Sequence, residues 1–494
     1  MKNRGQTTVF FSLIISVLLI FTLTALEVGR IYCGKIKIQS VVHSAQSGIM
    51  ADYNWELFER YHLLFLDPTY GTDSTAVLEE KFCEYIEASL SEQKFYDFSV
   101  DEIAVVDTKK ITDDHMRLLK KQISEYEREE GMVKKAYDLG KKFVDSSKDI
   151  KEAGEKTERN ATPIPETTNT EGETTEADKD SSPESEEDEV NVEDPRDILK
   201  NQLSLGLLAL VLPAGSSVSN ERQDFSKAVS SKYKESVSVE KDNSFSDVSK
   251  LVEVLGDSSK EETGKVLGVA DKLLFCSYVL DHFSYQGKPG DGRLKCETEY
   301  ILKGKDNDHD NLEAVISDII WIRMPVNYVC LIGDAKKQSE ALTLATAICS
   351  ATGTMPMVEV VKYLLLGCWS YGESIYEVRQ LMHGEKLPYI KTPVEWNTDL
   401  KTLAGTKEMK KVEAGLDYGD FLCMFLAMKE HKDMTYARML DVIEMNLRDD
   451  YENLTVVNLC GEVTIQGRIS FNPLLINRGD EELYNYYFEK IISY

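Results

Sequence analysis

The stretch 305–313, KDNDHDNLE, carries acidic or amide side chains at alternate positions, which is the arrangement of a calcium-binding loop. A complete EF-hand loop needs Gly at its sixth position and Glu at its twelfth, but this chain has Asn311 and Ser317 there. The alternative is a polar turn that leads into a helix, with Asp310 and Glu313 forming a capping box. The two departures from the calcium pattern favour the helix cap.

A second candidate metal motif is Asp242-Asn243-Ser244-Phe245-Ser246, which matches the Asp-x-Ser-x-Ser core of von Willebrand A domains. That core follows a buried parallel strand, which reads as a continuous apolar run. Here the preceding residues are SVSVEK, so the pattern argues against a metal site. The seven histidines show no metal-ligand spacing. We therefore predict neither a metal nor a cofactor.

Two carboxylates are close enough in sequence to suggest acid–base catalysis. Glu297 and Glu299 are two residues apart, which would place both on one face of a strand. Such a pair could serve as general acid and general base, but no other catalytic group lies nearby. The chain has no Gly-x-Ser-x-Gly elbow and no glycine loop that would hold a phosphate. The sequence therefore predicts no catalytic residue and a protein that is not an enzyme.

Three charged residues interrupt apolar helical stripes. Arg323 and Glu373 each lie on such a stripe, and Arg379 is a further candidate. A lone charge on an apolar face costs free energy unless it is paired. We predict that Arg323 pairs with Glu373, with Glu299 or Arg379 joining them. The interpretation we favour is a structural polar network, and a functional role is the alternative.

Apolar periodicity predicts the helices that would position these charges. They cover residues 262–285, 311–332, 335–350, 357–383 and 418–448, and a short apolar helix follows the Asp194-Pro195 cap. Residues 94–107 and 454–471 alternate like strands, the latter as a hairpin or strand pair. Because a lone hairpin is marginal in water, we predict that 100–107 pairs with 456–471. The expected fold class is mainly α (α+β), with a small antiparallel sheet.

The N-terminus carries an apolar run that could cross a membrane. Residues 9–26 contain no charge, and eighteen residues are about the minimum that spans a bilayer core of roughly 30 Å. A cleaved signal is the alternative, but Leu23-Thr24-Ala25 places a leucine where a cleavage site needs a small residue. We predict a single helix that continues to about residue 53. A basic leader before one span predicts a cytoplasmic N-terminus and an extracytoplasmic remainder.

Composition defines the remaining segments. Residues 152–194 are acidic and contain no aromatic residue, which predicts a disordered linker. The predicted organisation is an anchor helix 1–53, an α/β segment 54–151, this linker, and a mostly helical domain 195–494.

The net charge of −28 excludes a nucleic-acid partner, because phosphate contacts need clustered Lys and Arg. The nine cysteines contain no Cys-x-x-Cys pair, which suggests free thiols, with one or two disulfide bridges as the alternative.

The N-terminal motif resembles a known group of proteins. The motif consists of Gly5, the apolar run, and then Glu27, Gly29 and Arg30. It is similar to the start of TadE/TadG-like proteins of the Tad (Flp) pilus system. In TadE-like pseudopilins, prepilin peptidase cuts after the glycine, and a Glu lies five residues beyond it. This chain has Phe10 at the position of that Glu. The resemblance is therefore to TadG, and it implies a retained anchor.

A second resemblance covers most of the chain outside the linker. Four stretches look like a domain-of-unknown-function family of Gram-positive bacteria. They are ELFERYHLLFLD, CETEYILKGKDNDHDNLEAVISDIIWIRMPVNYVCLIGD, LLLGCWSYGESIYEVRQLMHGEKLPYIKTPVEW and GLDYGDFLCMFLAMKE. That family implies an association with Tad-type pilus genes and no known activity.

Together these features predict a single-pass membrane protein that acts as an extracytoplasmic component of a Tad-like pilus or secretion assembly. Its expected partners are other pilin-like or Tad-system membrane proteins. The alternatives are an exported hydrolase, a ligand-binding module, and a surface scaffold unrelated to pili.

Overall fold

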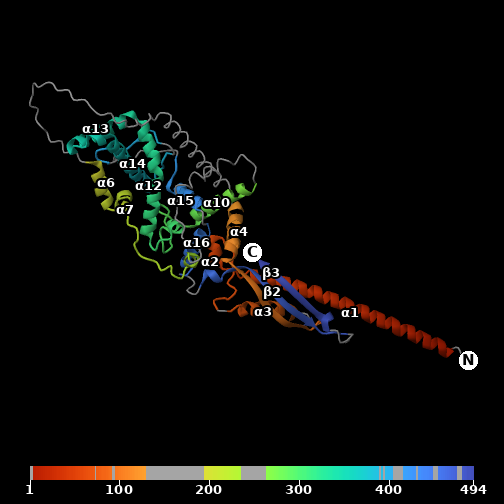
Figure 1. Ribbon diagram of the computed structural model, residues 1–494. Helices are drawn as coiled ribbons and strands as arrows, with labels where there is room; N and C mark the ends of the chain where they lie inside the picture. The colour runs from red at the N-terminus through yellow and green to blue at the C-terminus, as the bar shows by residue number, and fades with distance from the viewer. Residues whose placement is uncertain are drawn as a thin grey trace, which may run out of the picture. The chain divides into compact units, whose positions relative to one another are not determined.

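The computed structural model (Figure 1) describes the following residues: 4–72, 74–91, 95–129, 194–234, 263–388, 391–392, 395–403, 415–429, 432–448, 454–474 and 481–494. The predicted linker 152–194, apart from Asp194, and the Asp-x-Ser-x-Ser motif at 242–246 lie outside these ranges. The chain forms two compact units. Unit 1 contains Met1–Glu129, Ala228–Tyr233 and Tyr436–Tyr494, and unit 2 contains Glu130–Lys227 and Lys234–Thr435. These units differ from the predicted domains, because the last segment belongs with the N-terminal part rather than with 195–435.

Unit 1 is built on a three-stranded antiparallel sheet with the order β1-β2-β3. Its elements are α1 (Arg4–Met50), α2 (Trp55–Tyr61), α3 (Ala76–Ser91), β1 (Phe98–Lys110), α4 (Asp113–Glu129), α8 (Val229–Lys234), most of α16 (Lys432–Leu447), η3 (Val456–Asn458), β2 (Cys460–Phe471), η4 (Glu481–Tyr484) and β3 (Asn485–Ser493). The last residue of α8, Lys234, and the first residues of α16, 432–435, belong to unit 2.

The pairing of β1 with β2 confirms the predicted contact between 100–107 and 456–471. The register runs from Phe98 opposite Phe471 to Lys110 opposite Cys460. The segment 454–471 is one strand preceded by a 3-10 turn, so the expectation of a hairpin within it was wrong. The second partner of β2 is β3, which the sequence patterns did not reveal.

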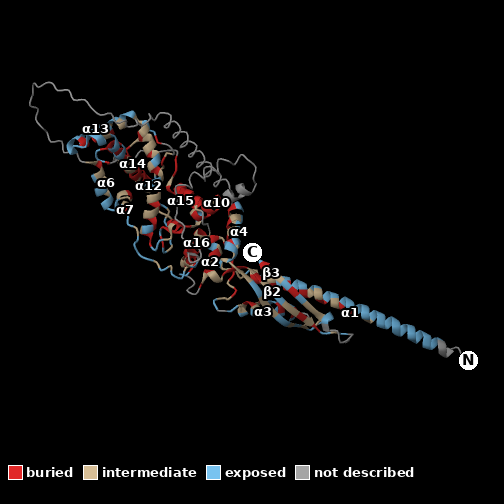
Figure 2. Cartoon of the chain, in the orientation of Figure 1, coloured by how far each residue is buried: buried red, intermediate tan, exposed pale blue. Residues whose placement is uncertain are grey.

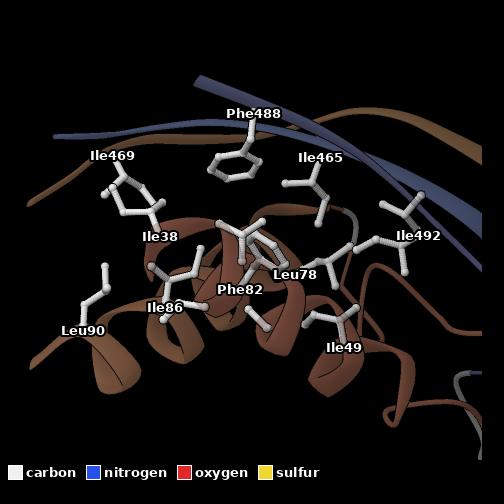
Figure 3. Close-up of a cluster of buried hydrophobic side chains, with 14 of the residues drawn as sticks. Ile38, Ile49, Leu78, Phe82, Ile86, Leu90, Ile465, Ile469, Phe488 and Ile492 are labelled. Carbon is white, nitrogen blue, oxygen red and sulfur yellow. The ribbon is translucent and has the colours of Figure 1, made fainter. Parts of the chain in front are cut away.

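Helices α1 and α3 cover one face of this sheet. Figure 3 shows their apolar side chains directed toward the sheet, where they meet side chains from β2 and β3. The labelled members of this core are Ile38 and Ile49 of α1, Leu78, Phe82, Ile86 and Leu90 of α3, Ile465 and Ile469 of β2, and Phe488 and Ile492 of β3. The mutual burial of these side chains is the main stabilising contribution to unit 1.

The helix α1 divides into an exposed half and a packed half. Its apolar N-terminal part is solvent-exposed, and the side of its C-terminal part that faces the sheet is buried (Figure 2). The segment Thr7–Met50 is long and apolar enough to cross a membrane, a property shared by anchors and by secretory signals. Asp308–Gly333 also meets this criterion, but this helix packs in the core of unit 2 and carries the buried Arg323.

In its described residues, unit 2 consists of helices joined by loops and contains no strand of the sheet. Its elements are α6 (Pro195–Ser204), α7 (Leu207–Val211), α10 (Thr263–His282), α11 (Glu297–Lys303), α12 (Asp308–Gly333), α13 (Ala335–Thr352), η1 (Met355–Met357), α14 (Val358–Met382) and α15 (Tyr418–Met428). Asp194 caps α6 by accepting a hydrogen bond from the backbone N–H of Arg196, as its place before Pro195 predicts. The predicted helix 418–448 is in fact two helices, because α15 ends with Lys429 in an extended conformation and α16 begins at Lys432.

Candidate functional site

The anchor signature of α1 forms a polar cluster at the point where the apolar run ends. Glu27 and Arg30 lie one helical turn apart and form an ion pair, with 3.0 Å between Arg30 Nη2 and Glu27 Oε1. Although both are charged, they are only 1% and 7% exposed. Buried charges need further partners, and the loop after β2 supplies them.

The backbone N–H of Leu474 donates to Glu27 Oε1 at 3.2 Å, and the hydroxyl of Tyr484 donates to the same oxygen at 3.1 Å. Arg30 donates to the backbone carbonyl of Asn472. We call these five residues, Glu27, Arg30, Asn472, Leu474 and Tyr484, the helix clamp. The clamp ties the end of the apolar run to the segment that connects β2 to β3.

Aromatic rings cover the guanidinium of the clamp. The Arg30 Cζ atom lies 5.6 Å from the ring centroid of Tyr96 and 5.6 Å from that of Phe471. A cation above an aromatic face is attracted by the ring quadrupole, by about 0.5–2 kcal/mol. The sequence motif Glu27 and Arg30 is therefore a device that fixes a helix to a sheet.

The other positions of the anchor signature have different surroundings. A Cβ atom added to Gly29 would meet nothing within 4 Å, so Gly29 does not mark a close approach to any described residue. At the buried Gly34, an added Cβ would lie 3.1 Å from Phe471 and 3.2 Å from Tyr96. Gly34 is therefore the glycine that lets α1 lie close to the sheet, although the motif does not include it. Gly5 lies within α1, and Phe10 is 62% exposed on the apolar run.

A second polar cluster lies in the core of unit 2, where the sequence predicts an ion pair. Arg323 on α12 binds Glu377 on α14, with 2.8 Å between Nε and Oε2 and 2.9 Å between Nη2 and Oε1. The prediction that Arg323 binds Glu373 directly was wrong. Glu377 is one helical turn further along α14 and faces α12, so it is the carboxylate within reach.

Lys391 joins Glu373 to this pair. Its ammonium group donates to Glu373 and, at 3.0 Å, to Glu377 Oε1. Glu373 Oε2 also accepts from the backbone N–H of Thr398 at 2.9 Å and from its hydroxyl at 2.6 Å. We call Arg323, Glu373, Glu377 and Lys391 the charge network. All four are at most 5% exposed, and two positive charges balance two negative ones.

The electrostatics of the charge network favour ionised side chains. Burial alone would raise the pKa of the Glu377 carboxyl, but the nearby Arg323 and Lys391 outweigh it and lower the pKa to about 2. Burial would lower the pKa of Lys391, yet Glu377 and Glu373 raise it above its ordinary value. Both shifts favour the charged forms of Lys391 and Glu377 at neutral pH. The hydrogen bonds of the network join α12, α14 and the segment around Thr398.

Glu299 and Arg379 lie outside the charge network. Arg379 Nε donates to the backbone carbonyl of Leu210 at 2.8 Å, which connects α14 to α7. Glu299 is on α11, which is a helix and not the predicted strand. Its Oε1 accepts from the Tyr418 hydroxyl at 2.8 Å and from the Gln286 N–H at 2.9 Å. Burial raises the pKa of the Glu299 carboxyl to about 7.

The stretch 305–313 forms a helix start, as the sequence predicts, but with a different cap. Asn307 is the N-cap of α12, and its side-chain oxygen accepts from the backbone N–H of Asp310 at 2.7 Å. The predicted capping box of Asp310 and Glu313 was therefore wrong. The ligand atoms of His309, Asp310 and Glu313 lie within 4.8 Å of one another. Asp310 already accepts from the Asn307 amide, which gives its carboxylate a structural role.

Sequence reasoning missed Glu377, Lys391 and the loop partners of Glu27. Glu377 was detectable, because it follows Glu373 by four residues and therefore shares its helix face. Lys391 lies between helices, where no periodicity indicates burial. The nine cysteines, all of them in described residues, are free thiols.

The fold and the two clusters define a helical protein that carries a small sheet fixed to a long apolar N-terminal helix. Residues 185–470 match a family of unknown function, DUF5702. The match covers more than half of the chain, and the chain belongs to this family. It includes the whole charge network and nearly all of strand β2, whereas Glu27 and Arg30 precede it. No curated protein and no solved structure matches the chain.

Proposed function

We propose that this protein is a membrane-anchored, extracytoplasmic component of a Tad-like pilus or secretion assembly, with a structural and interaction role rather than an enzymatic one. The observation that carries the proposal is the division of α1. Its first half is an exposed apolar helix, and its second half is fixed to a folded unit by the helix clamp. An exposed apolar helix of this length is stable in a bilayer and unfavourable in water.

The same helix supports retention of the anchor. α1 is continuous from Arg4 to Met50, and the clamp begins at Glu27, directly after the apolar run. A signal-peptide cleavage site there would need small residues in an accessible segment, but Leu23 occupies one of the required positions. We propose that the helix stays attached and holds unit 1 at the membrane surface.

An exposed apolar row on unit 2 supports the interaction role. Met357, the N-cap of α14, and Val360 and Leu364 within it recur at three- and four-residue steps, and each is about half exposed. Contiguous exposed apolar side chains are typical of surfaces that bind other proteins. We propose that this row binds a pilin-like or Tad-system membrane protein. Both buried clusters consist of groups engaged in structural bonds, which agrees with a non-enzymatic role.

Two measurements test the proposal. Fractionation followed by mass spectrometry of the mature protein should find it in the membrane with Met1, or a residue close to it, at its N-terminus. A mature start at Gln6 would indicate peptidase processing after Gly5, and a start near Leu26 would indicate a secreted protein. The variant Ile15→Lys with Leu18→Lys should release the protein from the membrane, because charges in the centre of a span are strongly unfavourable.

Crosslinked pull-down from cells tests the assembly. Recovery of a pilus ATPase, platform protein or pilin would support the proposal, and Val360→Asp with Leu364→Asp should reduce that recovery. Ala347→Asp, at an exposed position of α13, is the control and should leave it unchanged. Consistent recovery of other surface proteins alone would contradict the pilus assignment and favour an unrelated scaffold.

A further inference from the structure

A set of exposed apolar side chains surrounds the helix clamp. These are Tyr32, Phe95, Leu474 and Leu483, which are 71%, 62%, 57% and 51% exposed. We call this set the membrane collar. Its members come from α1, from the loop before β1 and from both sides of the connection between β2 and β3. Their convergence at one end of the sheet is a property of the fold, not of the local sequence.

The clamp fixes the height of the collar relative to the apolar run. Leu474 donates its own N–H to Glu27, and Leu483 directly precedes Tyr484, which donates its hydroxyl to Glu27. Phe95 packs edge-on against Tyr96, with ring centroids 5.2 Å apart, and Tyr96 covers Arg30. Each of these three collar residues is therefore held beside residues 27–30, the first turn after the uncharged segment ends.

The dimensions of a bilayer locate that turn. A helix rises 1.5 Å per residue, so residues 27–30 lie about 1.5–6 Å beyond Leu26, the last residue of the apolar run. The headgroup region adds roughly 5–8 Å on each side of the hydrocarbon core. A chain that spans the membrane with residues 9–26 consequently places the collar in the headgroup region, where aromatic and aliphatic side chains are favourable.

We infer that the membrane collar is embedded in the lipid interface, so that α1 and the end of the sheet at Phe98, Phe471 and Asn485 form one rigid membrane-contacting base. This inference rests on the proposed anchoring of α1. It adds a second contact with the bilayer, made by parts of the chain that lie far from α1 in sequence.

The sheet provides matched control positions. Val106 on β1 and Ile491 on β3 are 55% and 59% exposed, similar to the collar residues. Ile491 lies opposite Thr464, seven residues along β2 from Phe471. At about 3.3 Å per residue, this is roughly 23 Å from the collar end of the sheet. Val106 directly precedes Asp107, which also pairs with Thr464, so Val106 is about as far from the collar end of the sheet as Ile491 is. These two side chains should remain in water.

Photocrosslinking in vesicles tests the inference. The full-length protein, with p-benzoylphenylalanine at position Phe95, Leu474, Val106, Ile491 or Ile15, is reconstituted into phosphatidylcholine vesicles and irradiated. Lipid adducts are then quantified by mass spectrometry. We expect adducts from Ile15, Phe95 and Leu474, with yields from Phe95 and Leu474 several-fold above those from Val106 and Ile491.

The outcomes separate the inference from the proposed anchoring. Adducts from Ile15 without adducts from Phe95 and Leu474 would overturn the collar and leave the anchor intact. The absence of adducts from Ile15 would contradict the anchor itself. Equal yields at all sheet positions would show that the whole sheet lies on the bilayer, which also overturns the inference. Crosslinks from Phe95 to a second copy of the chain would make the collar a self-association surface instead.

Discussion

Arg323 and Glu377 form a two-pronged ion pair inside unit 2, with their side chains 4% and 1% exposed and two hydrogen bonds of 2.8 and 2.9 Å. The parallel geometry matches the fork of the guanidinium to both carboxylate oxygens. Because Lys391 and Glu373 complete a neutral set of four charges, removing one member leaves a buried charge unbalanced. The stability of unit 2 should therefore depend on charge balance within the network.

Arg323→Met should reduce the free energy of unfolding by about 3–5 kcal/mol, because Glu373 and Glu377 would then share one cation. Arg323→Met combined with Glu377→Gln should recover part of this loss, since Lys391 and Glu373 remain as a neutral pair. Chemical denaturation followed by tryptophan fluorescence is a suitable measurement, because Trp321, Trp369 and Trp396 all lie in unit 2.

Arg379→Met is the matched control for this experiment. Arg379 also lies on α14, but its hydrogen bond is to a backbone carbonyl, whereas Arg323 neutralises a buried carboxylate. Arg379→Met should therefore reduce the free energy of unfolding by less than Arg323→Met does. If the losses from Arg323→Met and Glu377→Gln simply add in the double variant, the two residues are not coupled and the charge-balance argument is wrong.

The charge network also predicts a loss of stability in acid. The pKa of Glu377 is about 2 in the folded protein, against an ordinary value of 4.5 for a free glutamate carboxyl. A lowered pKa stabilises the fold above the unfolded value, and this contribution disappears as the pH falls from about 4.5 to about 2. A shift of this size corresponds to about 3 kcal/mol. Between pH 4.5 and pH 2, the free energy of unfolding should change less with pH in the double variant Arg323→Met with Glu377→Gln than in the unmodified protein. An equal change in the two proteins would show that Glu377 is not the carboxyl responsible.

Glu299 predicts the opposite dependence on pH. Burial raises its pKa to about 7 in the folded protein, so the fold favours the neutral carboxyl. The destabilisation is absent below the unfolded pKa of 4.5, grows as the pH rises, and becomes constant above about 7. Glu299→Gln should therefore stabilise unit 2 at pH 8, by up to about 3 kcal/mol relative to its effect at pH 4.

The same denaturation measurement at the two pH values provides the internal control. The glutamine resembles the neutral carboxyl, so Glu299→Gln and the unmodified protein should have similar stability at pH 4. A stabilisation of the same size at both pH values would show that the ionisation of Glu299 is not responsible.

Much of the fold was predictable because helices carry their own periodic signal. The predicted helices at 262–285, 311–332, 335–350 and 357–383 correspond to α10, α12, α13 and α14. The contact between β1 and β2 followed from a simpler argument, that two isolated strand signals need partners. The break between α15 and α16 was missed, although the polar run KEHKD at 429–433 interrupts the apolar pattern there.

The charge network was only partly predictable because its geometry depends on tertiary packing. The apolar stripes around Arg323 and Glu373 identified two buried charges correctly. The burial of Lys391 results from the folding of a nonhelical segment over α14, and no local pattern encodes that path. Similarly, Glu27 and Arg30 were recognised as a motif, but their partners Asn472 and Leu474 are more than 400 residues away.

The packing of α1 gives the last prediction, which compares two glycines in one helix. Gly34→Leu should separate α1 from the sheet, because even a Cβ atom there would lie 3.1 Å from Phe471 and 3.2 Å from Tyr96. Overpacking of this kind typically costs about 1–3 kcal/mol. Gly29→Leu introduces the same side chain about one and a half turns earlier, where a Cβ would meet nothing within 4 Å. It should be neutral or stabilise the helix by up to about 1 kcal/mol. Hydrogen–deuterium exchange of residues 31–50 and of β2 should increase for Gly34→Leu only, and equal exchange in the two variants would show that Gly34 does not set the distance between α1 and the sheet.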